Sequence, residues 1–482
     1  MESAPRAQWG SRVGFVLAAA GSAVGLGNVW RFPYTVGEHG GGAFVLLFVL
    51  AIAFIGLPVL MAEFFLGRST QLSPVGAYRK FSSPGSPWML IGWMGVAAGF
   101  IILSYYSVVA GWCMHYAWVS VTESFVGQSP EEVQDTFVGL VTNPGLSTMW
   151  HLIFMGLTIS IVVAGVKGGI ELWVKILMPV LFVLLLILLA YATTLDGFGE
   201  GLAFVFTPDF SKVTGQSVLA ALGQGLFSLS VGMGALIVYG SYLSKRDDVV
   251  GASLTVGLID TVVAILAAVL LFPILFTVGQ EPNQGPGLVF VTLPIAFADM
   301  PGGLLLAPAF FILLTFAALT SAISLLEVTT SYFIDERGWS RTKAALGTGG
   351  LVALLGIPSA LAASSKIFGE GVKGIFGMDW LDLFDFVASN IILPLGAMGI
   401  SIFVAWYLDQ RIREENFKAG TKLEFLFVGW VILLRFVVPI AVLFVFLNAI
   451  GVLDLFGSET DPVEVLTEPN LPDSAESGAD PG

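Results

Sequence analysis

Charged residues are scarce in this chain. Only 12% of its 482 residues are Asp, Glu, Lys or Arg, whereas 56% are hydrophobic. Soluble domains carry about 25% charged residues, which cover the surface that faces water. The scarcity of charge excludes a soluble globular enzyme, and the abundance of hydrophobic residues excludes a disordered protein.

Cysteine and histidine are also rare. The single cysteine, Cys113, cannot form an intramolecular disulfide, and the three histidines do not stand at metal-ligand spacing. The sequence has no phosphate loop, zinc motif or nucleophile elbow, so we do not expect an enzyme. The net charge of −14 disfavours nucleic acid as a partner, and we expect no cleavable signal peptide.

Long apolar runs are abundant. A helix needs about 20 residues to cross the hydrocarbon core of a bilayer, and these runs are too long for the strands of a barrel. They predict an all-α polytopic membrane protein with eleven transmembrane helices. The predicted spans are 13–37, 42–66, 89–120, 148–166, 171–193, 217–242, 250–278, 304–334, 343–361, 382–408 and 423–450.

The positive charges orient these spans. With a cytoplasmic N-terminus, sixteen Lys and Arg fall in cytoplasmic segments, four fall in outer segments, and only Arg435 lies within a span. This distribution follows the positive-inside rule. It predicts a multi-pass protein of the cell (plasma) membrane with an extracellular C-terminus. The tail, 453–482, is acidic and rich in Pro and Ser, and is predicted to be disordered.

Two spans carry matching glycine clusters. Val24-Gly25-Leu26-Gly27 and Val231-Gly232-Met233-Gly234 share one pattern, and each falls in the first helix of a set of five. Glycine weakens a helix by roughly 1 kcal/mol per residue. Because five is an odd number, the second set must insert upside down. We therefore predict a 5+5 inverted repeat with broken helices 1 and 6, the usual place of a transporter's binding site. Close helix packing through small residues is the alternative.

The residues around these clusters resemble a known family. The stretches RAQW at 6–9, GSAVGLGNVWRFPY at 21–34, EHGGGAF at 38–44 and AALTS at 317–321 are similar to the neurotransmitter:sodium symporter family and its LeuT-type prokaryotic amino-acid transporters. The resemblance extends over all eleven spans. It implies a first five-helix repeat at 1–200, an inverted second repeat at 201–415 and an eleventh helix at 416–452.

The resemblance implies two sodium sites. The first would use Ala23, Asn28, Ser228 and Asp260 together with the substrate carboxylate. The second would use the carbonyls of Gly21, Val24 and Ala317 and the hydroxyls of Thr320 and Ser321. A ligand shared by ion and substrate would couple their binding.

The resemblance also implies a mostly apolar substrate site. It would be formed by Ser22, Ala23, Gly25, Leu26, Gly27, Ile102, Tyr106, Phe227, Ser228, Ser230, Met233, Ser321 and Leu325. Gly25 stands where monoamine carriers of the family place an acidic residue, which favours an α-amino acid that brings its own carboxylate. We therefore predict sodium-coupled symport of neutral, hydrophobic amino acids by alternating access.

Further family features fall on charged residues. Arg31 and Asp385 would form an external gate, and Arg6 and Asp335 a cytoplasmic gate with Trp9 nearby. Gly169 and Pro179 resemble a motif for unwinding segment 5, although a plain kink explains them equally well.

Three carboxylates lie within spans. Asp260 is predicted to supply the negative charge that chloride supplies in animal members, which makes transport chloride-independent; proton antiport or a structural role are the alternatives. Glu63 is expected to bind backbone near the unwound part of segment 1. Glu327 could tune the second sodium site or face a neighbouring helix.

Other functions stay open. A non-transporting amino-acid sensor, or a transporter of another small amine or osmolyte, would fit much of the same pattern. A channel is disfavoured because the sequence has no filter repeat. The sequence does not decide whether two copies form a homodimer.

Overall fold

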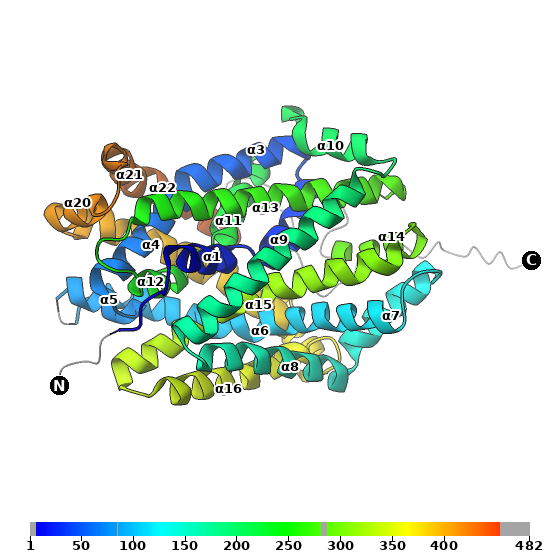
Figure 1. The fold of residues 1–482 in the computed structure, drawn as a ribbon, viewed down its shortest axis with the longest axis horizontal. Helices are drawn as coiled ribbons and strands as arrows, with labels where there is room; N and C mark the ends of the chain where they lie inside the picture. Colours follow the sequence, from blue (N-terminus) through cyan, green and yellow to red (C-terminus); the bar gives the residue numbers. More distant parts are fainter. Residues whose placement is uncertain (1–5, 84, 281–286, 454–482) are drawn as a thin grey trace, which may run out of the picture.

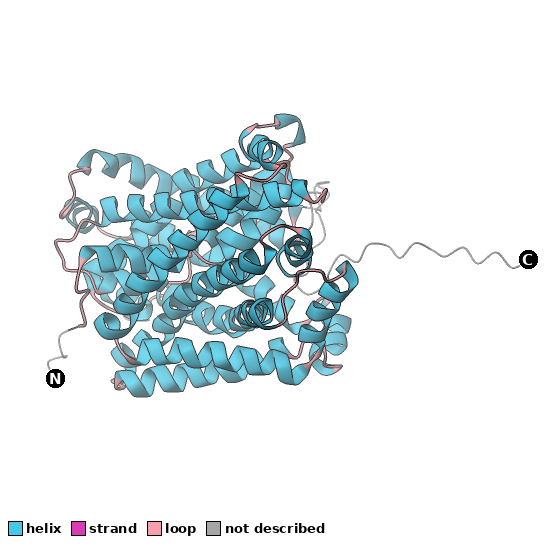
Figure 2. Cartoon of the chain, turned by 45° about the vertical axis from the view of Figure 1, so that its right-hand side comes forward, coloured by secondary structure: helices cyan, strands magenta, loops and turns pink. Residues whose placement is uncertain are grey.

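The computed structural model describes residues 6–83, 85–280 and 287–453. The predicted tail therefore lies, after its first residue, outside the described part of the chain. The described residues form helices, turns and loops, with one isolated antiparallel bridge between Gly41 and Pro208. The helices run side by side, and most loops gather at the two ends of the bundle (Figure 2).

Nine helical stretches of the described chain are long and apolar enough to cross a membrane. They are Gly42–Thr70 (α3, α4), Met89–Thr122 (α6), Pro144–Val163 (α8), Val166–Ala192 (α9 from Leu172), Val249–Thr277 (α13), Gly303–Arg337 (α15), Arg341–Ala360 (α16), Trp380–Tyr407 (α18, α19) and Glu424–Ala449 (α21, α22). Each coincides with one predicted span, apart from a few residues at the ends.

Two further predicted spans are broken helices. Segment 1 consists of α1 (Arg12–Ala23) and the stretch Gly27–Glu38, which contains α2 (Phe32–Glu38), with a bend of 51° between them. Segment 6 consists of α11 (Gly215–Ser228) and α12 (Ala235–Ser241). With these two, the structure accounts for all eleven predicted segments and confirms the breaks in helices 1 and 6.

Short helices connect the spans. They are α5 (Pro74–Phe81), α7 (Pro130–Thr142), α10 (Phe198–Phe206), α14 (Leu293–Asp299), α17 (Val372–Phe376) and α20 (Gln410–Lys418). The N-terminus, α5 and α20 lie at one end of the bundle, and α7, α10 and α14 lie at the other (Figure 1). This division matches the alternation that the positive charges predict.

Local chemistry explains both breaks. Ser11 caps the start of α1 through Gly14 N, and α1 ends where Val24 turns to an extended conformation. In segment 6, Gly232 and Gly234 have φ angles of 89° and 75°, which glycine adopts without steric cost. A Cβ on Gly232 would lie 2.4 Å from the carbonyl oxygen of Leu393. Segment 6 therefore breaks at residues that only glycine suits.

Two long helices form the centre of the bundle. Buried residues make up 83% of the apolar window in α6 and 78% in α15, but only 22% in Glu424–Ala449. α6 and α15 lie together through the middle, whereas α8 and α16 lie along one edge (Figure 1). Segments 1 and 6 are thus broken beside a continuous helical scaffold.

Candidate functional site

The two broken helices are joined to each other at their breaks. Ser230 Oγ donates to the Ser22 carbonyl oxygen at 2.8 Å, and Asn28 Nδ2 donates to Ser228 Oγ at 3.0 Å. Ser230 has a φ angle of 53°, a strained value for a residue other than glycine. The strain is retained because the turn aims its hydroxyl at segment 1. Unwound backbone from both helices therefore meets in the interior of the protein.

Carbonyl oxygens gather where the second sodium site is predicted. Ser321 Oγ lies 3.3 Å from the carbonyl oxygens of Gly21 and Ala317 and 3.5 Å from that of Val24. Thr320 Oγ1 lies 2.9 Å from the Ala317 carbonyl oxygen. A hydroxyl carries a single proton, so Ser321 can satisfy only one of its carbonyl neighbours at a time. The cluster is rich in oxygen and poor in donors, which suits a hard cation.

The cluster also includes a carbonyl that the sequence did not predict. The Ser22 carbonyl oxygen lies 3.3 Å from Ser321 Oγ and also accepts the hydrogen bond from Ser230. The side chain of Ser22 has a different partner, since Ser22 Oγ donates to Ser324 Oγ at 2.7 Å. Ser22 therefore connects the oxygen cluster of segment 1 with the break in segment 6. Backbone groups are invisible to a search for polar side chains.

Asp260 lies at the centre of the other predicted ion site. It is fully buried in α13. One carboxylate oxygen accepts from Asn28 Nδ2 at 2.8 Å, and the other accepts from Ser228 Oγ at 2.8 Å. No basic side chain of the described residues lies within ion-pair distance of it, so its immediate partners are neutral donors. A buried carboxylate without a cationic partner is costly in a bilayer unless a cation binds there.

Two more residues adjoin this site. Ala23, whose carbonyl is the fourth predicted ligand, is the last residue of α1 and is buried. Gln224, which the sequence did not single out, donates to the Gly27 carbonyl oxygen at 3.0 Å, while its own Oε1 is buried without a hydrogen-bond partner. Gln224 therefore brings an unpaired acceptor oxygen to the backbone next to Asn28.

Three predicted substrate-site residues converge on Gly25. A Cβ at this position would lie 2.6 Å from Ser321 Oγ and 3.1 Å from the Tyr106 hydroxyl. The same Tyr106 oxygen accepts from Leu26 N at 3.4 Å. Because Gly25 has no side chain, the backbone of segment 1 can lie close to both α6 and α15.

The apolar residues of the predicted site lie on the helices around it. Ile102 and Tyr106 follow Gly95 and Gly99 at the helical repeat, so the four residues share one face of α6. A Cβ added to Gly95 would lie 3.1 Å from the Met233 carbonyl oxygen. A Cβ added to Gly99 would lie 3.0 Å from the Leu325 carbonyl oxygen. All of these residues are buried. One face of α6 therefore meets both the break in segment 6 and α15.

An aromatic ring and a guanidinium cover one side of segment 1. The Phe227 ring lies 3.0 Å from the place of a Cβ on Gly27, and the Arg31 guanidinium lies 4.7 Å above that ring. Asp385 accepts from Tyr105 at 2.7 Å and from Ser389 at 2.9 Å. Among the described contacts, Asp385 does not reach ion-pair distance of Arg31. The described contacts of Asp385 therefore do not include the predicted external pair.

The other predicted pair, Arg6 and Asp335, is in contact. Arg6 Nη1 donates to both carboxylate oxygens of Asp335, at 2.6 and 2.5 Å. The remaining guanidinium nitrogens donate to Ser241 Oγ at 2.9 and 2.7 Å. Trp9 Nε1 donates to the Tyr239 carbonyl oxygen at 3.0 Å. The chain before α1 is thus fastened across the end of segment 6 and of α15.

Glu327 belongs to this closed end rather than to the oxygen cluster. Its carboxylate accepts from Arg341 at 2.9 and 2.6 Å and also from the Tyr242 hydroxyl. The Arg6 guanidinium lies 4.9 Å above the Tyr242 ring. Of the two alternatives for Glu327, the structure favours contact with neighbouring elements.

The expectation for Glu63 was wrong in its partner. Its carboxylate accepts from Gly232 N at 2.6 Å and from Ile237 N at 3.3 Å, in the break of segment 6 rather than of segment 1. The backbone amides freed by the break need an acceptor, and α4 packs against α12. Arg68 on the same helix donates to the carbonyls of Asp247, Asn416 and Ala419.

Glu171 is a further residue that the sequence did not predict. Its carboxylate accepts from Gly10 N at 2.6 Å, Ser11 Oγ at 2.9 Å and Lys175 Nζ at 2.6 Å. It follows Gly169 in a π-helical turn, Val166–Glu171, and Pro179 lies inside the helix α9 that comes next. Segment 5 is therefore helical here, and it holds the start of α1.

The arrangement defines a class of protein. A bundle of apolar helices with two broken spans, an oxygen cluster at the breaks and a closed end is that of a multi-pass membrane transporter. The sequence model of the Sodium:neurotransmitter symporter family matches residues 6–136 and 136–457. The chain belongs to this family and is not an enzyme.

Individual relatives agree. The chain is 39% identical over 450 residues to the uncharacterized sodium-dependent transporter YhdH of Bacillus subtilis, covering 92% of this chain and 98% of the relative. An uncharacterized sodium-dependent transporter of Haemophilus influenzae is 37% identical, with the same coverage. The crystal structure of MhsT in complex with L-phenylalanine matches with a TM-score of 0.84 and 47% identity, over 92% of this chain and all of that one. The LeuT-type fold and sodium dependence are thereby established.

Proposed function

We propose that the protein is a sodium-coupled symporter of neutral, hydrophobic amino acids. The observation that carries the proposal is the oxygen cluster around Ser321, which lies directly beside the unwound backbone at Gly25. Ion and substrate would then bind on the same unwound stretch of segment 1, and each would stabilise the backbone conformation that the other needs. The MhsT structure, which contains L-phenylalanine, supports the choice of an amino acid.

The substrate carboxylate would be received by segment 1. The Leu26 amide and the Tyr106 hydroxyl, which are 3.4 Å apart, would both turn to it. The amino group would meet the carbonyls freed by the break in segment 6. The side chain would lie against Ile102, Phe227, Met233 and Leu325, which are apolar and of adaptable shape. Backbone groups and the Tyr106 hydroxyl would thus bind the charged groups of the substrate, and the apolar side chains would select the size of the substrate side chain.

Two sodium ions would bind. One would lie among the carbonyls of Gly21, Val24 and Ala317 and the hydroxyls of Thr320 and Ser321. The other would lie among Ala23, Asn28, Ser228 and Asp260, completed by the substrate carboxylate. Because Asp260 brings its own charge to a buried site of neutral donors, transport would not require chloride.

In alternating access, segments 1, 2, 6 and 7 would rock against a scaffold of segments 3, 4, 8 and 9. The closed contact of Arg6 with Asp335 would open to the cytoplasm after the outer side has closed. The N-terminus would lie on the cytoplasmic side of the cell membrane, as the distribution of Lys and Arg predicts.

Equilibrium binding tests the substrate class. Purified protein should bind labelled leucine in sodium but not in potassium, and phenylalanine, methionine and tryptophan should compete. Competition by dopamine or betaine, but not by these amino acids, would favour the alternative of another small amine or osmolyte. Binding with no sodium-driven uptake would favour an amino-acid sensor.

A further inference from the structure

Two arginines meet at one helix end far from the broken helices. Arg435 lies in Glu424–Ala449, and Arg413 is a buried residue of α20. Arg413 Nη1 lies 3.0 Å from the Val404 carbonyl oxygen and 2.8 Å from that of Ala405. Arg435 Nη2 donates to the same Ala405 oxygen at 2.8 Å. Both guanidinium groups thus share the last carbonyls of the stretch Trp380–Tyr407.

The positive charge at this point exceeds what surrounds it. A helix C-terminus supplies only about half a negative charge, whereas the two guanidiniums carry a full charge each. No carboxylate of the described residues lies within ion-pair distance of either. Three acids lie near Arg413 in sequence and have other partners. Asp409 accepts from the amides of Arg411 and Ile412 at 2.8 and 3.4 Å. Glu414 pairs with Lys418 and Glu415 with Arg411, each at 2.7 Å.

Each arginine also keeps an unused donor. The Nε atoms of Arg413 and Arg435 are buried and have no hydrogen-bond partner. Leaving such a donor unsatisfied is costly, more so on a charged group. A negatively charged acceptor with several oxygens at the partly exposed Arg435 would balance the excess charge.

The surroundings indicate where that acceptor comes from. The Arg435 guanidinium lies 4.8 Å from the centre of the Trp406 ring, and Trp406 is 57% exposed. Next to Arg435, the side chains of Phe436 and Ile432 are each 50% exposed. An exposed tryptophan beside exposed apolar side chains is typical of a membrane–water interface. A molecule that reaches these arginines from outside would come from the lipid.

We propose that Arg413 and Arg435 bind the phosphate of an anionic phospholipid. Its acyl chains lie along the exposed apolar face of α21 (Phe427–Ile432) and α22 (Val438–Ala449). α20 lies at the same end of the bundle as the N-terminus (Figure 1), so the lipid belongs to the predicted cytoplasmic leaflet, whose anionic headgroups attract basic side chains. The proposal does not depend on the transported substrate.

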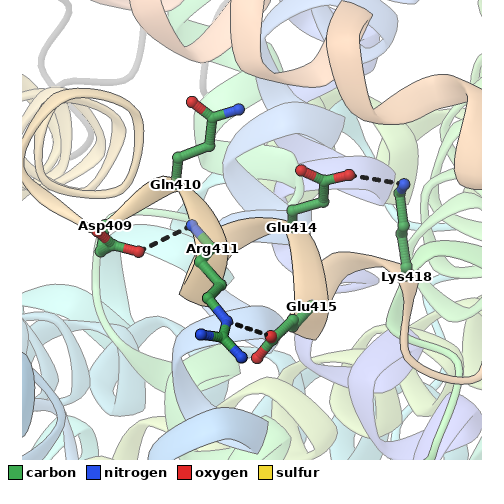
Figure 3. A pocket seen from close by; sticks show the side chains of 6 residues that line it. All are labelled: Asp409, Gln410, Arg411, Glu414, Glu415 and Lys418. Carbon is green, nitrogen blue, oxygen red and sulfur yellow. Dashed lines mark hydrogen bonds and ion pairs between the residues drawn. The ribbon is translucent and has the colours of Figure 1, made fainter.

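α20 also offers a matched control. Arg411 lies two residues from Arg413, on the other side of the helix, and forms an i,i+4 pair with Glu415 at 2.7 Å. Figure 3 shows this pair beside that of Lys418 with Glu414, around a surface hollow of about 580 Å³. The guanidinium of Arg411 is thus already paired and exposed, so its removal should leave the lipid site intact.

The test is a titration of the full-length protein by native mass spectrometry. Phosphatidylglycerol is compared with phosphatidylcholine for the wild type, Arg435→Gln, Arg413→Gln and Arg411→Gln. We expect the wild type and Arg411→Gln to prefer phosphatidylglycerol, and either of the other variants to bind it roughly fivefold to tenfold more weakly. Thermal stabilisation by the same lipids, relative to each variant's own value in phosphatidylcholine, separates loss of lipid from loss of fold.

Two results would overturn the proposal. Equal affinity of Arg435→Gln and Arg411→Gln for phosphatidylglycerol would mean that the arginines only cap a helix. Stabilisation by millimolar inorganic phosphate, equal to that by the lipid, would mean a site for a free anion. If Arg435→Gln does not fold, the phosphatidylglycerol affinities of Arg413→Gln and Arg435→Lys are compared with that of Arg411→Gln instead.

Discussion

At the scale of single residues, a carboxylate without a cationic neighbour is the most informative feature. Asp260 is fully buried, and among the described residues its carboxylate accepts hydrogen bonds from the neutral groups of Asn28 and Ser228 alone. Its charge would be offset when sodium binds, which is why it is the natural point at which to test chloride independence.

Asp260→Asn keeps the shape of the side chain and removes its charge. We expect chloride-free uptake to fall at least about tenfold, which corresponds to roughly 1.4 kcal/mol, and added chloride to restore part of it. The control is Asp248→Asn at the start of the same helix, since Asn caps a helix as well as Asp. Normal chloride-free uptake by Asp260→Asn would contradict the assignment.

Gly25 gives a second test at this scale. A methyl group there would lie 2.6 Å from Ser321 Oγ and 3.1 Å from the Tyr106 hydroxyl. Gly25→Ala should therefore weaken sodium-dependent substrate binding by about tenfold or more, which equilibrium binding measures.

The matched substitution is Gly223→Ala in α11, whose added carbon would make an ordinary contact of 3.8 Å with Val445. If both variants bound substrate like the wild type, the space at Gly25 would have no role in recognition.

The contacts made by side chains of the site were easier to predict from the sequence than the contacts made by backbone groups. Asn28, Ser228 and Asp260 stand in different spans, and the family pattern was sufficient to bring them together. The Ser22 carbonyl and the donors around Glu171 were missed, because a carbonyl oxygen has no residue type and a carboxylate before an apolar helix resembles a simple surface charge. The partner of Glu63 was wrong because two breaks of similar sequence lie within reach of α4.

At the scale of elements, the stretch before α1 is fixed by several contacts, and two of them involve a carboxylate on another helix. Arg6 pairs with Asp335 on α15, and Gly10 and Ser11 bind Glu171 before α9. In the proposed mechanism both would have to break before the cytoplasmic side opens, so each should control opening without touching the substrate.

Asp335→Asn should separate transport from binding. Loss of the ion pair favours the inward-open state, so uptake should fall about tenfold, while binding at saturating sodium stays within about threefold of the wild type. Binding and uptake are measured on the same preparation. Parallel loss of both would show that Asp335 stabilises the fold rather than the gate.

Glu171→Gln tests the second contact. Without the charge, its bonds to Gly10 and Ser11 weaken, because charge-assisted hydrogen bonds are about twice as strong as neutral ones. We expect faster hydrogen–deuterium exchange in peptides covering residues 6–14, and unchanged exchange in α8. Glu415→Gln on the exposed part of α20 is the control. Unchanged exchange at 6–14 would show that Arg6 alone holds this stretch.

The fold itself was largely predictable at this scale. Lengths of apolar runs and glycine positions gave all eleven segments, since a bilayer admits few alternatives to a long helix. The connecting helices α5, α7 and α10 were not predicted, because they lie outside the apolar runs. The π-helical turns, such as Val166–Glu171, depend on tertiary contacts that no local pattern records.

At the scale of the whole molecule, the structure is closed at the end where the N-terminus lies and has Arg31 and Phe227 over the other side of segment 1. In the proposed mechanism, sodium and substrate would be held in this state before release to the cytoplasm. Sodium should therefore stabilise this conformation, and the gradient should drive uptake.

The most direct test is uptake into proteoliposomes of a mixture of labelled amino acids, driven by an inward sodium gradient and compared with potassium and choline, with and without chloride. Concentrative uptake of leucine, phenylalanine, methionine or tryptophan that requires sodium and not chloride is the predicted result. Equal uptake with potassium, or sodium-driven uptake of none of these amino acids, would contradict the account.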